Sequence, residues 1–263
     1  MLTPGQLSEF HENGFVFIGQ VATDEEFQAL VERCDDIMQG RIQYKGMSFQ
    51  LDWNSSETMP VSGGFQGPSD NYRKIQGWER DPVFLSYLQH SIFHGITRQL
   101  IGEDVSIFRS MFMNKPAGRG TYLPYHQDGG TNLGLSINDG SKYATVWTAL
   151  DDASIDNGCV QIVPGSHKLG LLSEQGLTIS EEQELEHAPD EKSHFIELKA
   201  GEVVVLHNYL LHRSGVSRTE RPRRGFSVCY MEAAICNLSS NKHYPVAFGE
   251  NALRIEEEEV VGV

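Results

Sequence analysis

The sequence predicts a mainly β fold in which a closed antiparallel β architecture is covered by N-terminal helices. Segments with helical periodicity come first in the chain, and short runs of β-branched and aromatic residues follow them. Gly- and Pro-containing turns separate most of these runs. Helices followed by short, turn-bounded strands are typical of chains whose helices gather on one side of an antiparallel sheet.

A capping box predicts the first helix. Thr3 supplies a hydroxyl at the N-cap, Pro4 takes the first helical position, and Gln6 lies three residues after the cap. Gly14 is a stop signal, and the apolar run at residues 15–18 is then typical of a buried strand. The sequence therefore predicts a short helix that leads directly into the β structure.

Two further helices are predicted before the main run of strands. Thr23 and Glu26 form a second capping box, and apolar residues recur at helical spacing over residues 27–38. Asp81-Pro82 opens a third helix, which we expect to continue as one unit toward Gly102. The second helix has a clear apolar face, so we expect it to cover a sheet.

The remaining strands are predicted from their composition. They are expected at residues 105–114, 143–150, 160–163, 195–198, 203–206 and 225–231. A β-rich chain of this length commonly forms one domain, so we expect residues 1–263 to be a single domain.

Three segments lack a regular pattern. Residues 40–73 are rich in Gly, Ser, Asn and Pro with isolated aromatics, which is typical either of a functional lid or of a surface loop packed by its own side chains. Residues 171–192 are polar and acidic, which indicates an insertion between strands. The acidic tail at 254–263 is expected to be solvated.

Composition narrows the function classes. Hydrophobic residues make up 39% and charged residues 22%, as in ordinary globular proteins, and the formal net charge of −15 argues against nucleic-acid or anionic-membrane partners. The four cysteines show no Cys-x-x-Cys spacing, and no secretory or membrane-spanning segment is evident. We therefore expect reduced thiols and a cytoplasmic location. The oligomeric state is unknown from the sequence.

A candidate metal site lies in the stretch Tyr125-His126-Gln127-Asp128. In an extended segment residues i and i+2 point to the same face, so His126 and Asp128 lean into one space while Gln127 points away. The best third ligand is His212, with His207 as the alternative; both come after the β-branched run at 201–206. Two histidines and one carboxylate suit a non-haem Fe(II) oxygenase.

Several separated motifs support this interpretation. They are Lys74-Ile75-Gln76, Met111-Phe112-Met113-Asn114-Lys115-Pro116, Tyr125-His126-Gln127-Asp128, Trp147-Thr148-Ala149-Leu150, Asn157-Gly158-Cys159, Pro164-Gly165-Ser166-His167 and His212-Arg213-Ser214-Gly215 followed by Arg223. In this order and spacing they resemble the phytanoyl-CoA dioxygenase family of Fe(II)- and 2-oxoglutarate-dependent oxygenases, from Leu7 to about Ala233. The resemblance implies a double-stranded β-helix, which is a cupin-like jelly roll.

The resemblance also implies the roles of individual residues. His126, Asp128 and His212 match the family's iron ligands, which are its catalytic centre. Arg223, eleven residues beyond His212, matches the arginine for the distal carboxylate of 2-oxoglutarate, which a bidentate guanidinium suits. Ser214 is placed to donate to the same carboxylate.

Other positions have weaker assignments. By the same resemblance, Lys74, Met111 and Trp147 border the co-substrate, although Trp147 could serve core packing alone. Trp53 in the expected lid and Asn132 after the His-x-Asp motif are candidate substrate contacts. His167 in the Pro-Gly-Ser-His motif is expected to be a structural turn histidine.

The reaction implied is hydroxylation of an unactivated C–H bond, with Fe(II), 2-oxoglutarate and O₂ consumed to give succinate and CO₂. Related halogenating enzymes have a small residue where this chain has Asp128, so hydroxylation is favoured, with desaturation, epoxidation and ring closure left open. A chain this acidic offers no clear platform for coenzyme A phosphates, which favours a small polar metabolite or natural-product intermediate. The alternatives are an acyl-CoA hydroxylase, a non-catalytic metal-binding sensor and a Zn²⁺-dependent cupin-like enzyme.

Overall fold

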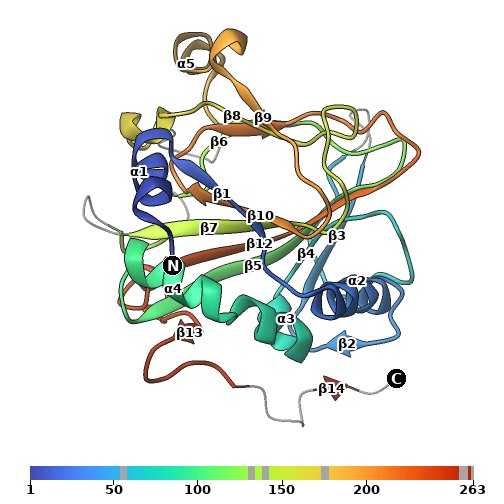
Figure 1. The fold of residues 1–263 in the computed structure, drawn as a ribbon. Helices are drawn as coiled ribbons and strands as arrows, with labels where there is room; N and C mark the ends of the chain where they lie inside the picture. Colours follow the sequence, from blue (N-terminus) through green and yellow to red (C-terminus); the bar gives the residue numbers. More distant parts are fainter. Residues whose placement is uncertain (54–57, 130–133, 138–141, 173–177, 255–259, 262–263) are drawn as a thin grey trace.

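Two antiparallel sheets lie face to face in the protein, with helices on the outer side of the larger sheet (Figure 1). This computed structural model describes residues 1–53, 58–129, 134–137, 142–172, 178–254 and 260–261. The expected mainly β jelly roll with N-terminal covering helices is confirmed.

The larger sheet is built from β1 (Phe15–Gln20), β3 (Ser48–Leu51), β4 (Tyr72–Gln76), β5 (Val105–Lys115), β7 (Tyr143–Ala149), β10 (Glu202–His207), β12 (Arg223–Glu232) and β13 (Val246–Phe248). Its order is β1-β10-β7-β12-β5-β4-β3, with β13 paired to β5. The smaller sheet has β6 (Leu123–His126), β8 (Val160–Ile162), β9 (His194–Ile196) and β11 (His212–Ser214), in the order β6-β11-β8-β9. All six strands expected after the helices are present.

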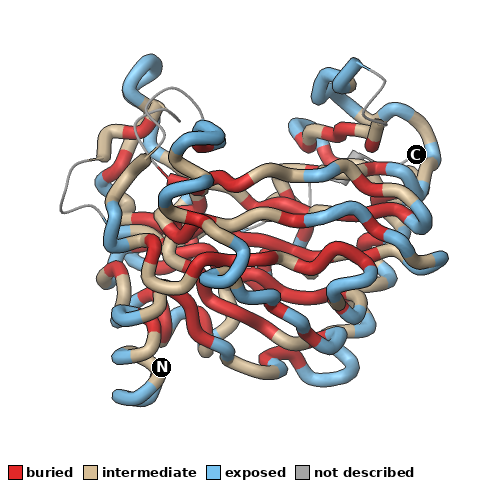
Figure 2. Tube along the Cα trace, turned by 90° about the horizontal axis from the view of Figure 1, so that it is seen from above, coloured by how far each residue is buried: buried red, intermediate tan, exposed pale blue. Residues whose placement is uncertain are grey.

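The larger sheet is buried on both faces because helices cover one face and the smaller sheet covers the other. Along β10, Val203 and Val205 pack into the cluster beneath the helices, whereas Val204 and Leu206 pack into the cluster between the sheets. This explains why the run reads as continuously apolar instead of alternating with polar residues. Figure 2 shows the buried backbone concentrated in these central strands.

The first two helices form as expected. They are α1 (Pro4–Asn13) and α2 (Asp24–Met38), and each begins with a complete capping box. Thr3 Oγ1 accepts from the N–H of Gln6 at 3.3 Å, and Thr23 Oγ1 accepts from the N–H of Glu26 at 3.2 Å. Both helices pack on the larger sheet through the main core cluster.

The third expected helix is two helices. Asp81 caps α3 (Pro82–Leu88), and α4 (Ser91–Leu100) begins after a break at Gln89-His90. His90 has an extended ψ of 141° and its Nδ1 accepts from the N–H of Ile92 at 3.2 Å, so it starts a new helix. Because neither Gly nor Pro marks the break, the continuous apolar spacing hid it.

The irregular segments contain more structure than expected. The segment 40–73 includes β2 (Gln43–Tyr44) and β3, which pairs with β4 as part of the larger sheet. The acidic insertion contains α5 (Glu181–His187), and the C-terminal tail contains β14 (Val260–Val261), which pairs with β2. The expected solvation of the acidic tail concerns Glu256–Glu259, which lie outside the described residues.

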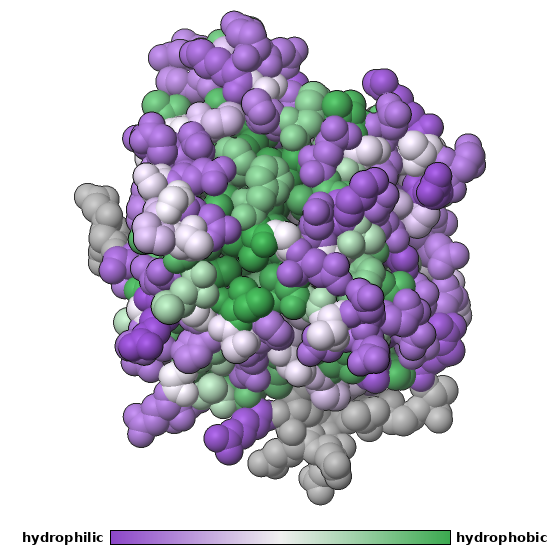
Figure 3. All heavy atoms as spheres, in the orientation of Figure 1, coloured by the Kyte–Doolittle hydropathy of each residue, from purple (hydrophilic) through white to green (hydrophobic). Residues whose placement is uncertain are grey.

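An apolar area rimmed by hydrophilic residues lies in the middle of the face seen in Figure 3. A groove of about 340 Å³ between α2 and α3 is lined in part by Leu30, Pro82 and Tyr87. Among the described helices, none combines the length and the apolar character needed to cross a membrane.

Candidate active site

Three side chains with metal-binding groups meet between the two sheets. One ligand atom from each of His126, Asp128 and His212 lies within 4.8 Å of the others, and no other such group of three occurs among the described residues. His126 and His212 are directly opposite each other on the paired strands β6 and β11. The strand pairing therefore sets the separation of the two imidazoles.

Both imidazoles are oriented by backbone carbonyls. Nδ1 of His126 lies 2.9 Å from the oxygen of Pro124, and Nδ1 of His212 lies 2.9 Å from the oxygen of Leu210. A proton on each Nδ1 leaves the Nε2 lone pair free for a metal. Burial, followed by the nearby His212, lowers the pKa of His126 to about 3, so this ring is neutral near pH 7.

Asp128 is held by a partly buried arginine that the sequence analysis did not single out. Arg109 on β5 donates from Nη2 to Asp128 Oδ1 at 2.5 Å, and the backbone N–H of Asp128 donates to the oxygen of Asn208 at 2.8 Å. Burial alone would raise the pKa of Asp128, but Arg109 with the two histidines reverses that effect and lowers it. The carboxylate is therefore ionised and fixed in orientation.

Gln127 points away from the two neighbouring side chains, as the extended geometry required. Its amide nitrogen donates to the oxygens of Gly170 and Tyr209, both at 2.8 Å, and its oxygen accepts from the N–H of Leu172 at 2.8 Å. The side chain is fully buried. It thus ties the strand end that carries His126 to the start of the acidic insertion.

Arg223 lies at the other end of the same cavity. The residue is 3% exposed, and its Nη2 donates to the oxygen of Gly158 at 2.8 Å, while its Nε has no hydrogen-bond partner among the described residues. Ser214 is buried and lines the same cavity, together with the metal-binding group. Buried donors without acceptors are rare in native structures, so this end is suited to receive an anion.

Met111 and Trp147 also line this cavity, as expected. The guanidinium carbon of Arg223 lies 5.7 Å from the centre of the Trp147 ring, and a Cβ at Gly225 would lie only 2.3 Å from that ring. Gly225 therefore makes room for the Trp147 ring. Lys74 on β4 is only partly buried and does not line the cavity in the described structure.

The candidate substrate contacts stand apart from this cavity. Trp53 lies under the guanidinium of Arg73, 4.8 Å from ring centre to carbon, and does not line the cavity in the described part of the chain. Asn132 lies outside the described residues. His207 packs against His167 with ring centres 4.9 Å apart and does not join the three-residue group.

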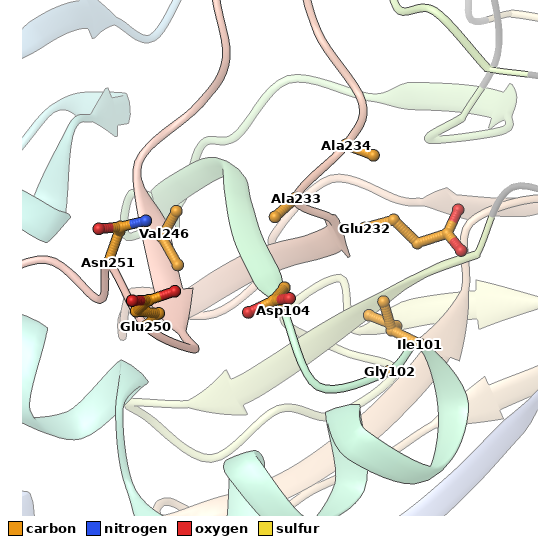
Figure 4. Close-up of a pocket in the computed structure, with 9 residues that line it drawn as sticks. All are labelled: Ile101, Gly102, Asp104, Glu232, Ala233, Ala234, Val246, Glu250 and Asn251. Atoms are coloured by element: carbon orange, nitrogen blue, oxygen red, sulfur yellow. The ribbon is translucent and has the colours of Figure 1, made fainter.

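A separate cleft, where β5 begins and β12 ends, contains none of the expected site residues. Figure 4 shows Asp104, Glu232 and Glu250 around this space, which has a volume of about 450 Å³. Its described lining includes carboxylates but neither histidine nor a basic side chain. The cavity between the sheets is therefore the better candidate for chemistry.

Comparison with known sequences agrees with the motifs. Residues 10–225 match the family described as phytanoyl-CoA dioxygenase (PhyH). A protein from Arabidopsis thaliana named phytanoyl-CoA dioxygenase is 26% identical, over 91% of this chain and 92% of its own length. The human peroxisomal phytanoyl-CoA dioxygenase is 24% identical, over 100% of this chain and 76% of its own length.

Solved structures share the fold. EctD from S. alaskensis, determined with 2-oxoglutarate and 5-hydroxyectoine, aligns with a TM-score of 0.69 at 18% identity, covering 96% of this chain and 82% of its own. The α-ketoglutarate-dependent carbocyclase SnoK from nogalamycin biosynthesis aligns with a TM-score of 0.69 at 23% identity, covering 90% and 86%. At such identities the likeness establishes the architecture alone.

Proposed function

Because the chain belongs to the phytanoyl-CoA dioxygenase family of Fe(II)- and 2-oxoglutarate-dependent oxygenases, we propose that His126, Asp128 and His212 hold the iron and that Arg223 binds 2-oxoglutarate. The supporting observation is one cavity with these three groups at one end and a buried guanidinium at the other. Two imidazoles and a carboxylate are the donor set that Fe(II) prefers in this class.

The residues of this cavity fit both Fe(II) and 2-oxoglutarate. The free Nε2 atoms of the histidines and the ionised Asp128 supply three ligands, and the unpartnered Nε of Arg223 can donate to a carboxylate. Ser214 lies beside Arg223 and can add a hydroxyl donor. Bound Fe(II) with 2-oxoglutarate and O₂ supplies an oxidant for C–H bonds and releases succinate and CO₂.

The protein contributes orientation and exclusion of water. Met111, Trp147 and Leu206 form apolar walls of the cavity, which strengthen the charged contacts inside it. Arg109 fixes the carboxylate of Asp128, and the carbonyls of Pro124 and Leu210 fix the rings.

We propose a small polar metabolite or natural-product intermediate as the substrate, and hydroxylation as the reaction. SnoK, from nogalamycin biosynthesis, and EctD, whose structure was determined with 5-hydroxyectoine, support this class. The curated relatives' names keep an acyl-CoA as the second candidate. Succinate release in the presence of each candidate compound tests the assignment, and a response to acyl-CoA thioesters alone would reverse it.

We also propose that this enzyme acts in the cytoplasm and has no nucleic-acid partner. The net charge of −15 and the four free thiols support the proposal. The human relative is peroxisomal, so the location of a fluorescent fusion is the informative measurement. Peroxisomal fluorescence would contradict it.

The central test is anaerobic titration of the Fe(II)-loaded protein with 2-oxoglutarate, followed by its weak visible charge-transfer band. We expect wild type to show the band. His212→Ala, which loses a ligand, and Arg223→Ala, which loses the carboxylate contact, should not show it. Wild-type protein that binds metal without showing the band would refute the proposed co-substrate site. It would favour a metal sensor or a Zn²⁺ enzyme.

A further inference from the structure

Two buried cations face each other across a strand pair at the co-substrate end of the cavity. Lys115 on β5 is directly opposite Arg223 on β12, and the two residues are 5% and 3% exposed. Like charges directly opposite on paired strands destabilise a sheet, and burial increases the cost. Neither cation forms an ion pair with a carboxylate within the described residues.

The side chain of Lys115 is closely packed by the neighbouring backbone. A Cβ at Gly120 or at Gly158 would lie 2.9 Å from its side-chain carbons, and its Nζ donates to the oxygen of Thr121 at 2.7 Å. A neutral amine can make this hydrogen bond as well as an ammonium can. The enclosure therefore accepts Lys115 without a charge.

Three charged groups around Lys115 change its pKa in different directions. Arg223 faces it from β12, Arg73 from β4, and Asp52 from the segment after β3. Burial, then Arg223 and Arg73, lowers the pKa of Lys115 to about 6, and Asp52 opposes the shift. Oδ1 of Asp52 accepts from the N–H and hydroxyl of Thr121, at 3.1 and 2.6 Å.

Arg223 connects the surroundings of Lys115 with the cavity of the metal-binding group. Arg223 lines both the cavity of the metal-binding group and a smaller adjoining cavity lined by Lys115 and Arg73. Met113, Leu123 and Ser214 also belong to both linings. A carboxylate bound at Arg223 therefore lies close enough to offset the repulsion between the two cations.

We propose that Lys115 is neutral while no carboxylate is bound at Arg223, and that it takes up one proton from solvent when 2-oxoglutarate binds. The inference rests on the proposed function. The amine becomes an ammonium, and no bond of 2-oxoglutarate changes. Lys115 thus acts as a proton-coupled partner of the co-substrate site.

The direction of the pH dependence follows from linkage. Lys115 is mostly neutral above its pKa of about 6 in the free protein, and the bound carboxylate raises that pKa. Binding then takes up a proton in this interval, so the affinity for 2-oxoglutarate falls as the pH rises from about 6, by at most about tenfold per pH unit. Both carboxylates of 2-oxoglutarate are ionised throughout.

Calorimetry measures this proton directly. The protein is loaded with Mn(II) in place of Fe(II), which prevents turnover, and is titrated with 2-oxoglutarate near pH 7 in two buffers of different ionisation enthalpy. We expect wild type to take up a measurable number of protons, at most about one, for each 2-oxoglutarate bound. Lys115→Met should lack this uptake, and Lys199→Met, an exposed lysine paired with Asp152, should retain it.

The outcomes separate the two proposals. Equal proton uptake by wild type and Lys115→Met would overturn the role of Lys115 while the 2-oxoglutarate site stands. Absence of any 2-oxoglutarate binding by Mn(II)-loaded wild type would overturn the proposed function itself. Lys115→Arg, which stays charged, provides a second variant if the Met variant fails to fold: weaker pH dependence than wild type supports the role, and an unchanged dependence overturns it.

Discussion

The two ends of the cavity between the sheets differ in how buried charge is balanced. At the end with the metal-binding group, the carboxylate of Asp128 is paired with Arg109 at 2.5 Å. At the other end, Arg223 and Lys115 are both buried, and their hydrogen bonds run to backbone oxygens. At the end with Asp128, positive and negative charges are nearly balanced without a ligand. At the end with Arg223, positive charge is in excess.

This difference indicates two ways of preparing a site. The pair of Arg109 with Asp128 holds a proposed metal ligand in position before a metal binds, which reduces the ordering needed on binding. The excess positive charge at Arg223 instead favours an anion when one enters. Substitutions at the two ends should therefore change different measured quantities.

The largest effect is expected at the balanced end. Arg109→Met leaves the partly buried Asp128 unpaired, so the free energy of unfolding of the metal-free protein should fall by about 3 kcal/mol. Urea denaturation measures this loss. Added Mn(II) should restore part of the stability, because the metal supplies the missing positive charge.

The matched variant at the other end is Arg223→Met. Because Arg223 has no acidic partner among the described residues, its removal should change the stability of the ligand-free protein by less than about 1 kcal/mol. The affinity for 2-oxoglutarate should fall at least about 30-fold, the equivalent of about 2 kcal/mol. Equal stability losses for Arg109→Met and Arg223→Met would refute the contrast between the two ends.

The smallest effect is expected at an ion pair next to a candidate ligand. Arg213 follows His212, and its guanidinium pairs with Glu184 at 3.2 Å and with Asp190 at 2.6 Å. Arg213→Gln should lower the stability by about 0.5–1 kcal/mol and change the Mn(II) affinity less than twofold. A larger fall in Mn(II) affinity, measured by calorimetry, would mean that the insertion positions His212.

The sequence was most informative where strand geometry and spacing determine the site. His126, Asp128 and His212 were expected together and lie together, and Arg223 and Ser214 share their cavity. The pairing of His126 with Asp128 follows from the two-residue period of strands, whereas Arg223 was expected from the resemblance to the family.

The partners that balance charge could not be found in this way. Arg109 lies in a long strand among apolar residues, and periodicity does not say which face of β5 looks into the cavity. The contact with Asp128 depends on the packing of β5 against the smaller sheet's loops, which no local pattern encodes. The break between α3 and α4 was missed for a similar reason, since neither Gly nor Pro marks it. The strand β3 was missed because it is only four residues long.

The buried amide of Gln127 sets practical limits for building chimaeras of this enzyme. Its three hydrogen bonds are made with Gly170, Leu172 and Tyr209. The first residues of the acidic insertion are therefore held against the end of the strand that carries His126. The insertion returns to that strand at Ile179, whose N–H donates to the oxygen of Tyr125 at 3.1 Å. A loop grafted from a relative should therefore start after Leu172 and rejoin before Ile179. A longer graft would replace the contacts that hold the strand end with His126.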